Sequence, residues 1–373
     1  MRKLLTIAGT RPEIIKLSCL LPKLDKYFNH KLLHTGQNYD KNLNDVFFKD
    51  LKLRKPDFKC ILKNKSLFQN ISEIFIYVEK KIISFNPDSI LILGDTNSGL
   101  SALVAKKFKI PIFHLEAGNR CFDERVPEES NRRIIDHLSD INMVYTEHAR
   151  KNLLREGIHP SKIIKTGSPM PEIINKNLNK ILKSKILEKL GIEKNNYILL
   201  SSHREENLDN KANFINLIKF ISKLKKLDKK IVLSMHPRFK KKLLKSDKIK
   251  NLSRFVLINK PFSFTDYIYL QKNAYLVFSD SGTIVEESSI LKINSIIIRE
   301  AHERPEGDDE GINALYDLDP KNYSEMLKTI SEFKKKYTLE VPKDYRSKNF
   351  SQIVINTILS KINKIKKYTY FEF

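Results

Sequence analysis

Short runs of apolar residues alternate along the chain with longer runs in which apolar residues recur every three or four positions. In the first half, the short runs predict strands, and their sequences are KLLTIAG, KLLHTG, SILILGD, IPIFHLEAG and INMVYT. Helices are expected from about Glu13, between Ile71 and Ile83, and from about Gly99 to Phe108. Strands that alternate with helices imply a parallel sheet that is covered by helices.

The same alternation restarts after the turn-rich segment GSPMPE, with the runs YILLSSH, KIVLSMHP, FVLIN, AYLVFSD and NSIIIRE. The predicted fold class is therefore α/β, with two Rossmann-like, doubly wound domains at residues 1–170 and 171–348. A last amphipathic run, from about Asn349 to Lys366, has no strand after it, so residues 349–373 are a candidate to pack back on the first domain. Ligands of such sheets lie beyond the carboxyl ends of the strands, so we expect the two domains to face each other across a binding cleft.

Composition narrows the cellular setting. With 41% apolar residues among 373, the chain can bury a core in each of two domains. It contains no apolar run of the roughly 18 to 20 residues that cross a bilayer, and the N-terminal LLTIAG is too short for a signal peptide. Three widely spaced cysteines, Cys19, Cys60 and Cys121, form no CxxC pair, which favours a reducing compartment and no structural zinc. We therefore expect a soluble cytoplasmic protein without membrane insertion.

The formal net charge of +24 raises the question of a polyanionic partner. The lysines are spread singly among Ile, Asn and Leu, as in KNKILKSKILEKLGIEKNN, and form no basic patch interleaved with aromatic residues. A solvated, Lys-biased surface is therefore preferred to nucleic-acid or membrane binding, and it would also attract a small anionic substrate. Arginine, whose planar fork matches phosphate and carboxylate, gathers in a few Gly- and Pro-containing stretches, at Arg11, Arg120, Arg125, Arg132, Arg133, Arg204, Arg238, Arg299 and Arg304.

The motif GTRPEIIK lies between the first predicted strand and the first predicted helix. Gly9 permits a tight turn there, and Pro12 suits the first turn of a helix. Arg11 and Lys16 could then face an anion held at the helix N-terminus. The alternative is a turn with a solvent-facing arginine.

Carboxylates recur in the three motifs GDTNSG, HLEAGNR and VPEESNRR. Asp95 and Glu116 each end a predicted strand. Glu128 and Glu129 begin a predicted helix after Pro127. Acidic groups at the ends of adjacent strands are costly to bury unless they are used, so the pattern indicates general acid–base chemistry. The alternative is a set of solvated surface carboxylates.

The second domain carries SSHREEN and MHPR, each after a predicted strand. His203 and His236 could carry a proton or neutralise a phosphate, and the neighbouring Arg204 favours the phosphate role for His203. A histidine at either position could also be a satisfied core residue.

SDSGTIVEES is the clearest nucleotide signal in the chain. Ser281, Gly282 and Thr283 open a predicted helix, whose N-terminal N–H groups and dipole can bind phosphate. Glu287 lies within reach of a ribose, and Tyr267 in FSFTDY could stack on a base. Neither GxGxxG nor GxxxxGKS/T is present, which disfavours NAD and ATP.

Taken in order, GTRPEIIK, GDTNS, HLEAGNR, PEESNRR, SSHREEN, MHPR, SDSGTIVEES and HERPEG resemble the motifs of the non-hydrolysing UDP-N-acetylglucosamine 2-epimerase family, from residue 2 to about residue 360. The resemblance implies two Rossmann-like domains in the arrangement of B-type glycosyltransferases (GT-B), a homodimer, and a reaction without metal, nicotinamide or other cofactor. It also implies a UDP-linked 2-acetamido sugar as substrate. Carbon 2 would be inverted by anti elimination of UDP to a 2-acetamidoglycal, followed by re-addition.

The resemblance further implies roles for individual residues. Asp95, Glu116 and Glu128 match the family's catalytic carboxylates, and His203 matches its active-site histidine. The positions that match UDP-binding residues are Arg11, Lys16, Tyr267, Ser281, Gly282, Thr283, Glu287 and Arg304. Two of these depart from the family's pattern, which often has another aromatic residue in place of Tyr267 and more usually has Gly in place of Thr283.

Two loops point to one branch of the family. GNRCFD and EAHERPEG resemble the branch that makes UDP-N-acetyl-L-fucosamine from UDP-2-acetamido-2,6-dideoxy-L-talose for capsule or O-antigen. Phe122 in the first loop could pack on the methyl group of a 6-deoxy sugar. The alternatives are the ordinary gluco/manno pair of UDP-N-acetylglucosamine, a hydrolysing relative and, more distantly, a GT-B glycosyltransferase.

Overall fold

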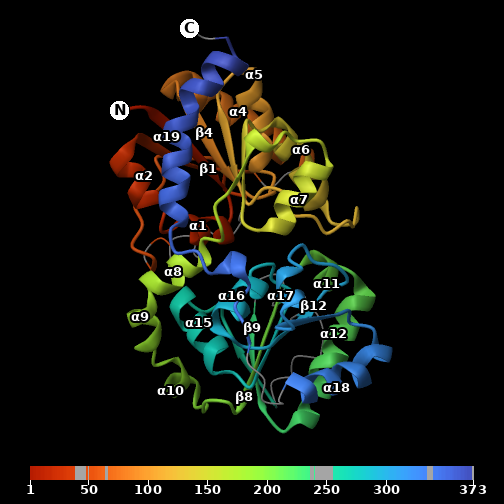
Figure 1. Cartoon of the computed structure of the whole chain (residues 1–373). Helices are drawn as coiled ribbons and strands as arrows, with labels where there is room; N and C mark the ends of the chain where they lie inside the picture. The colour runs from red at the N-terminus through yellow and green to blue at the C-terminus, as the bar shows by residue number, and fades with distance from the viewer. Residues whose placement is uncertain are drawn as a thin grey trace. The chain divides into compact units, whose positions relative to one another are not determined.

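The structure, a computed structural model, describes residues 1–37, 48, 50–63, 66–235, 239, 255–333 and 339–371. The chain divides into a first unit, Met1–Lys176 with Lys343–Phe373, and a second unit, Asn177–Pro342 (Figure 1). Each unit is built on a parallel sheet with helices packed against it. The predicted α/β class with two Rossmann-like domains is therefore confirmed.

The boundaries of the units differ from those expected at 170/171 and 348/349. Helix α8 (Met170–Lys176) belongs to the first unit, because its Glu172 accepts hydrogen bonds of 2.8 and 2.9 Å from the hydroxyl and backbone N–H of Ser351. The chain returns to the first unit before residue 349, because the Asp344 carboxylate accepts a 2.8 Å hydrogen bond from the backbone N–H of Glu147.

The sheet of the first unit has the strand order β3-β2-β1-β4-β5-β6-β7, and every neighbouring pair is parallel. The strands are β1 (Lys3–Ala8), β2 (Asn29–His34), β3 (Phe58–Lys59), β4 (Ser89–Leu93), β5 (Ile112–Leu115), β6 (Ile141–Val144) and β7 (Ile163–Lys165). Besides α8, the helices of this unit are α1 (Arg11–Leu17), α2 (Leu21–Tyr27), α4 (Leu67–Phe85), α5 (Ala102–Lys107), α6 (Pro127–Leu138), α7 (Glu147–Arg155) and α19 (Phe350–Thr369).

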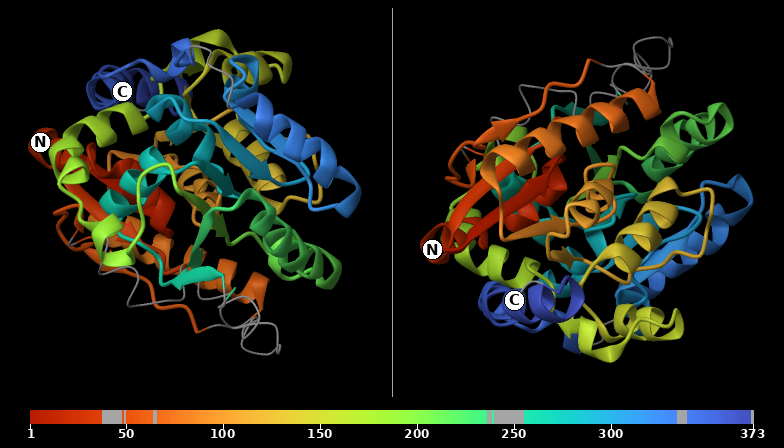
Figure 2. Two further views of the ribbon diagram at one scale, coloured as in Figure 1. Left: turned by 90° about the horizontal axis from the view of Figure 1, so that it is seen from below. Right: turned by 90° about the horizontal axis from the view of Figure 1, so that it is seen from above.

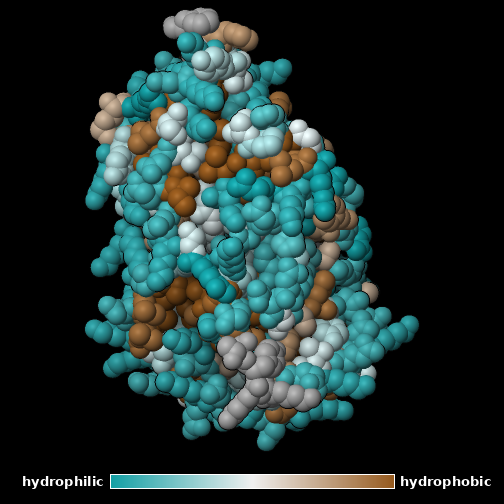
Figure 3. Space-filling view, viewed as in Figure 1, coloured by the Kyte–Doolittle hydropathy of each residue, from teal (hydrophilic) through white to brown (hydrophobic). Residues whose placement is uncertain are grey.

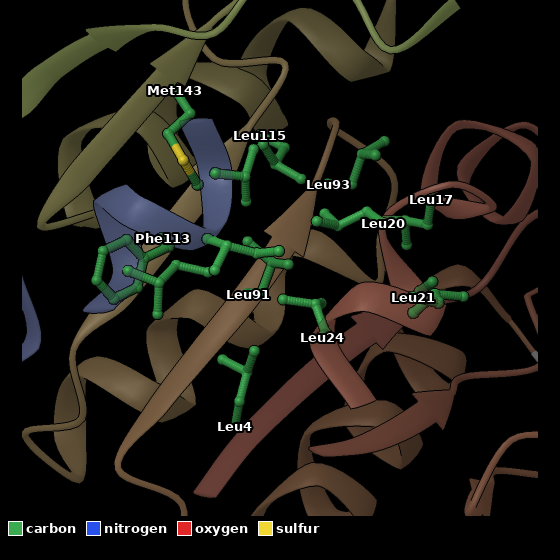
Figure 4. Close-up of a cluster of buried hydrophobic side chains, with 14 of the residues drawn as sticks. Leu4, Leu17, Leu20, Leu21, Leu24, Leu91, Leu93, Phe113, Leu115 and Met143 are labelled. Atoms are coloured by element: carbon green, nitrogen blue, oxygen red, sulfur yellow. The ribbon is translucent and has the colours of Figure 1, made fainter. Parts of the chain in front are cut away.

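Alternate residues of these strands face opposite helical layers, as the two-residue repeat of a strand requires. Leu4 and Leu91 lie in a core with residues of α1, α2 and α19, and Figure 4 shows the strand leucines facing those of α2. Leu5 and Ile92 lie in the other core, with residues of α4, α5 and α6. Helices α4 and α19 accordingly appear on opposite sides of the sheet in the right-hand view of Figure 2.

The sheet of the second unit has the parallel strand order β10-β9-β8-β11-β12-β13. The strands are β8 (Tyr197–Ser202), β9 (Lys230–Met235), β10 (Val256–Asn259), β11 (Leu276–Ser279), β12 (Ser295–Ile298) and β13 (Asn313–Tyr316). The helices are α9 (Leu178–Leu182), α10 (Ile186–Leu190), α11 (Glu205–Leu208), α12 (Lys211–Leu224), α15 (Phe264–Asn273), α16 (Ile284–Leu291), α17 (Glu306–Asp309) and α18 (Tyr323–Phe333). Leu200 and Phe278 pack with α12 and α18 in a hydrophobic core of this unit.

The surface seen in Figure 3 is mostly hydrophilic, with smaller hydrophobic areas between. This accords with a chain in which 30% of the residues are charged. Within the part of the chain that the structure describes, no helix combines the length and the apolar character needed to cross a membrane.

Candidate functional site

Both sheets reverse their strand order beside their first strand, and in such sheets ligands bind beyond the carboxyl ends of the strands at that point. In the first unit the point lies between β1 and β4, which are followed by Gly9 and by the Gly94–Asp95 turn. In the second unit it lies between β8 and β11, which are followed by His203 and by Asp280. The motifs GTRPEIIK, GDTNSG, SSHREEN and SDSGTIVEES therefore begin at the carboxyl ends of these strands.

The loop after β1 is fixed by Glu13, which the sequence analysis did not include among the site residues. Its buried carboxylate accepts hydrogen bonds of 2.6 and 2.7 Å from the backbone N–H groups of Gly9 and Thr10, and one of 2.6 Å from the Thr96 hydroxyl. Thr10 and Glu13 form a capping box, and Pro12 occupies the first turn of α1 as expected. Glu13 thereby ties the loop after β1 to the loop after β4.

Gly9 is required by close approach rather than by a turn conformation. Its φ is not in the positive region, so the backbone conformation does not require glycine. A Cβ at this position, however, would lie 2.1 Å from the hydroxyl oxygens of both Thr35 and Ser98. The two hydroxyls are themselves hydrogen-bonded over 2.7 Å. The expected role of Gly9 in a tight turn is therefore replaced by a packing role.

Lys16 and Glu116 are brought into contact at the edge of the first sheet. The Lys16 ammonium on α1 donates to the carboxylate of Glu116, which directly follows β5, and both residues are buried. Glu116 has φ +65°, in the left-handed region that costs a non-glycine residue conformational energy. Arg11, the first residue of α1, is half-buried.

Helix α6 carries the side chains that hold Asp95, and it also carries Glu128. The Arg132 guanidinium pairs with the Asp95 carboxylate and donates over 3.0 Å to the carbonyl oxygen of Asn119. Asn131 donates over 3.0 Å to the backbone carbonyl of Asp95. Glu128 lies half-buried in the first turn of α6, which places it on the element that holds Asp95.

The neighbouring Glu129 makes hydrogen bonds that hold the fold together. It is fully buried and accepts hydrogen bonds of 2.9 Å from the backbone N–H of Cys121 and of 3.0 Å from Arg133. It thereby fixes the loop between Glu116 and α6. In that loop Phe122 has φ +54° and is 70% exposed, an unusual setting for an aromatic side chain.

In the second unit, Asp280 organises the loop after β8. This buried carboxylate accepts hydrogen bonds from the Ser202 hydroxyl (2.7 Å) and from the backbone N–H groups of His203 (3.0 Å) and Arg204 (3.1 Å). His203 Nδ1 lies 3.2 Å from the same carboxylate. Burial raises the pKa of Asp280, but the charge of His203 and these hydrogen bonds outweigh it, so the pKa is lowered. Asp280 is a site residue that sequence reasoning missed, although it lies inside the motif SDSG.

Tyr267 and Glu287 lie in one hydrogen-bonded region of the second unit. The Tyr267 hydroxyl lies 2.8 Å from the Ser201 hydroxyl, and Gln271 donates over 2.5 Å to the Glu287 carboxylate. Burial, with the nearby charge of Glu287, raises the pKa of Tyr267 to about 12. Tyr267 therefore remains a neutral phenol across the pH range of ordinary enzyme assays.

Ser281, Gly282 and Thr283 form the turn that leads into α16. The Ser281 and Thr283 hydroxyls lie 3.0 Å apart. A Cβ on Gly282 would come within 2.8 Å of the Glu303 carboxylate and 3.0 Å of the Arg304 guanidinium. A larger residue at this position would have to displace these two side chains, because the segment HERPEG packs directly against the turn.

Arg304 is buried and held by two carboxylates. It donates over 2.9 Å to Glu286 and over 2.8 Å to Glu303, and Glu303 also accepts a 3.0 Å hydrogen bond from Arg299. The fixed guanidinium lies beside Gly282 at the start of α16. This is a geometry suited to a phosphate group.

Of MHPR, only Met235 lies within the described residues, so His236 and Arg238 lie outside them. Among the residues that the structure describes, no group of three His, Cys, Asp or Glu side chains is arranged to hold a metal ion.

Comparison with known proteins places this architecture among nucleotide-sugar enzymes. The sequence model of the family UDP-N-acetylglucosamine 2-epimerase matches residues 23–359. The fold is similar to UDP-N-acetylglucosamine 2-epimerase from Rickettsia bellii, with a TM-score of 0.90, 43% identity and coverage of 100% of both chains. It is also similar to UDP-GlcNAc 2-epimerase from Methanocaldococcus jannaschii in complex with UDP-GlcNAc and UDP, with a TM-score of 0.89, 34% identity and coverage of 96% of this chain and 99% of that chain. UDP-2,3-diacetamido-2,3-dideoxy-D-glucuronate 2-epimerase from Pseudomonas aeruginosa is 30% identical over 84% of this chain and 88% of its own length.

Proposed function

Because the chain belongs to the UDP-N-acetylglucosamine 2-epimerase family, we propose that it inverts carbon 2 of UDP-2-acetamido-2,6-dideoxy-L-talose, forming UDP-N-acetyl-L-fucosamine. The enzyme is an isomerase that acts on a UDP-sugar, as its relatives do. The observation that carries the chemistry is the pairing of two carboxylates, Asp95 and Glu116, with the buried cations Arg132 and Lys16 at the edge of one sheet. The observation that carries the choice of sugar is the exposed Phe122 between Glu116 and Glu128.

The paired carboxylates suit proton removal from a weak carbon acid. The buried cations Arg132 and Lys16 balance the charges of Asp95 and Glu116 and hold both side chains in place, and a carboxylate at either position can accept a proton. The hydrogen on carbon 2 becomes acidic only as the bond from carbon 1 to UDP breaks and leaves positive character on the sugar. One carboxylate accepts that proton, UDP departs with the bonding electron pair, and the 2-acetamidoglycal remains. Protonation of carbon 2 on the opposite face, with return of UDP to carbon 1, completes the inversion.

The second unit supplies groups for the departing diphosphate. We assign the N–H groups at the start of α16, the Ser281 and Thr283 hydroxyls, and Arg304 to UDP, with Glu287 at the ribose. Stabilising the diphosphate as it leaves lowers the barrier to elimination. Asp280 orients His203 through the 3.2 Å contact, which directs the imidazole for a role at the leaving group.

The choice of a 6-deoxy sugar is supported by the loop that Glu129 anchors. Phe122 lies exposed in the loop between Glu116 and Glu128, where a methyl group could pack on it. One methyl contact supports a preference of only roughly ten- to two-hundredfold. The Pseudomonas aeruginosa relative carries a name that specifies a different UDP-sugar, so substrate choice varies among proteins at this level of identity. The second candidate substrate is UDP-N-acetylglucosamine, which is favoured by the names of the Rickettsia bellii and Methanocaldococcus jannaschii enzymes.

Incubation of the purified enzyme in deuterated water with each UDP-sugar alone tests the proposal. We expect solvent deuterium at carbon 2 of the product, with faster turnover of the L-talo 6-deoxy sugar. Faster turnover of UDP-N-acetylglucosamine under the same conditions would refute the choice of sugar but leave the epimerase intact. Stoichiometric release of free UDP without an epimer would instead indicate hydrolysis, and no reaction before an acceptor is added would indicate a glycosyltransferase.

The variant Phe122→Ala sharpens the choice of sugar. It should lower kcat/KM for the 6-deoxy sugar by roughly tenfold and leave the value for UDP-N-acetylglucosamine unchanged. Ile61→Ala is a matched control, because Ile61 is also exposed, at 71%, but lies before β4. An equal loss of kcat/KM for both sugars after Phe122→Ala would mean that Phe122 makes no contact specific to the methyl group.

A further inference from the structure

A chain of alternating charges lies buried beneath the carboxylate-bearing turns of the first unit. His114 on β5 contacts Asp136 on α6, with 2.9 Å between Nδ1 and Oδ1. Asp136 Oδ2 accepts from Arg120 over 2.8 Å, and Arg120 in turn donates to Glu156 over 2.8 and 2.6 Å. The side chains of His114, Asp136 and Arg120 have no exposed surface. None of the four was needed to account for proton transfer or UDP binding.

The partners of the His114 ring fix its protonation. Nε2 lies 2.8 Å from the carbonyl oxygen of Gly94, which can only accept a hydrogen bond, and Nδ1 faces the Asp136 carboxylate. Each acceptor needs an N–H donor, so both ring nitrogens of His114 must carry a proton. The pair of His114 and Asp136 therefore holds one proton more than a neutral imidazole beside an ionised carboxylate. The Arg120 cation on the other oxygen of Asp136 keeps that proton on the imidazole.

The charge balance agrees with a protonated His114. With an imidazolium, the four side chains contain two cations, His114 and Arg120, and two anions, the buried Asp136 and the partly exposed Glu156, and their net charge is zero. His137, on the next position of α6, lies 3.5 Å from Glu156 but is half exposed and stands outside this chain.

The pair holds the backbone of two turns that carry catalytic candidates. Gly94, whose carbonyl faces His114, immediately precedes Asp95. Gly118, whose N–H donates over 3.1 Å to Asp136, follows Glu116 by two residues. The turn that begins at Glu116 is strained, because this non-glycine residue has φ +65°, in the left-handed region. Such a turn persists only when surrounding groups hold it.

We propose that His114 and Asp136 form a buried imidazolium–carboxylate pair that positions Asp95 and Glu116 for proton transfer. The pair acts through the backbone of Gly94 and Gly118 and does not touch the substrate. The functional part of the inference rests on the proposed epimerase activity, whereas the protonation of His114 does not. A misplacement of about 1 Å in a reacting group can cost about a hundredfold in rate, so a loss of either hydrogen bond should appear in kcat.

Nuclear magnetic resonance of the full chain with 15N-labelled histidine tests the pair directly. The His114 resonance, assigned by its loss in His114→Gln, should show that both ring nitrogens are protonated, as the two acceptors require. In Asp136→Asn the same resonance should move to a neutral tautomer at neutral pH, because the anion that holds the second proton is gone. A neutral His114 in the wild-type enzyme would overturn the proposal.

Turnover separates positioning from mere stability. In His114→Gln the amide can still donate to Gly94 but not to Asp136. In His114→Asn the amide can donate to Asp136 but not to Gly94. Each should lower kcat by roughly tenfold or more while the affinity for UDP, assigned to the second unit, stays within about threefold. His137→Gln is the matched control and should leave both unchanged. Wild-type kcat in both His114 variants, measured with whichever UDP-sugar the wild type epimerises, would refute the positioning role. Absence of any epimerisation by the wild type would refute the proposed function instead.

Discussion

The ammonium group of Lys16 pairs with the carboxylate of Glu116 while only 6% and 7% of the two side chains are exposed. Removing one partner leaves the other charge buried without a counter-ion. We expect Lys16→Met and Glu116→Gln each to lower the free energy of unfolding by about 3 kcal/mol or more. The double variant should be less destabilised than the sum of the two, and urea unfolding of all four proteins checks this. An additive double variant would mean that the pair contributes no coupling.

The two glutamates that open α6 should respond differently to substitution. Glu128→Gln should lower turnover by roughly a hundredfold or more and leave stability within about 0.5 kcal/mol, since Glu128 is only half-buried. Glu129→Gln should lower stability by about 1 to 3 kcal/mol, because the buried carboxylate loses its charged hydrogen bond with Arg133. Deuterium exchange and denaturant unfolding measure the two effects. If Glu129→Gln were inactive and Glu128→Gln active, the catalytic assignment would move to Glu129.

Arg304 should contribute to UDP affinity through its fork geometry. Lysine cannot reproduce the two hydrogen bonds to Glu286 and Glu303 while also reaching a phosphate. Arg304→Lys should therefore raise the Kd for UDP by roughly tenfold or more. Titration calorimetry measures the Kd, with Lys321→Gln as a control on an exposed cation of the same unit. An unchanged Kd would remove Arg304 from the UDP site.

His34 should make the fold sensitive to acid. Burial, with a contribution from the charge of Lys59, lowers the pKa of His34 from 6.5 to about 4. Nδ1 accepts a 3.1 Å hydrogen bond from Gly36, and Nε2 has no partner among the described residues. Between those two pKa values the unfolded chain binds the proton and the folded chain does not. Stability is therefore full above pH 6.5 and falls by about 3 kcal/mol as the pH drops to 4.

The variant His34→Asn tests this effect, because asparagine can accept from Gly36 but does not titrate. The loss of stability between pH 7 and pH 5, measured by urea unfolding, should be smaller in this variant than in the wild type by about 2 kcal/mol. His159→Asn, which removes an exposed histidine, should keep the wild-type dependence. Equal dependence in all three proteins would contradict the assignment.

The sequence predicted the central strands well, because each is an apolar run that is buried on both faces. β4 (Ser89–Leu93) and β5 (Ile112–Leu115) are buried at every position, for example. Three strands at the edges of the sheets were not predicted, namely β3, β7 and β13. β3 contains two residues and neither is buried, so it has no apolar period to detect. Its pairing depends on β2, which no local pattern reveals.

Only some residues of the candidate site could be singled out from the sequence, because a local pattern marks some of them and not the others. Asp95 and Glu116 could be singled out because they end strands, a position readable from the sequence. Glu13 was missed although the Thr10–Glu13 spacing is that of a capping box, a local signal that was available. Asp280 and His114 could not be assigned their roles from the sequence, since their partners come from distant segments. Gly9 was assigned a turn conformation, whereas its need for a small residue arises from hydroxyls on Thr35 and Ser98.

Helix α19 has a consequence for the order in which the protein folds during synthesis. Phe350, Val354 and Ile358 lie in the same core as Leu4 and Leu91, so that core is complete only when α19 is present. A ribosome makes the whole second unit before it makes α19. The nascent first unit therefore exposes part of this apolar core while the second unit emerges, and exposed apolar surface favours aggregation during that interval. A nonsense mutation near residue 345 would damage the first unit, although the codon lies beyond the second.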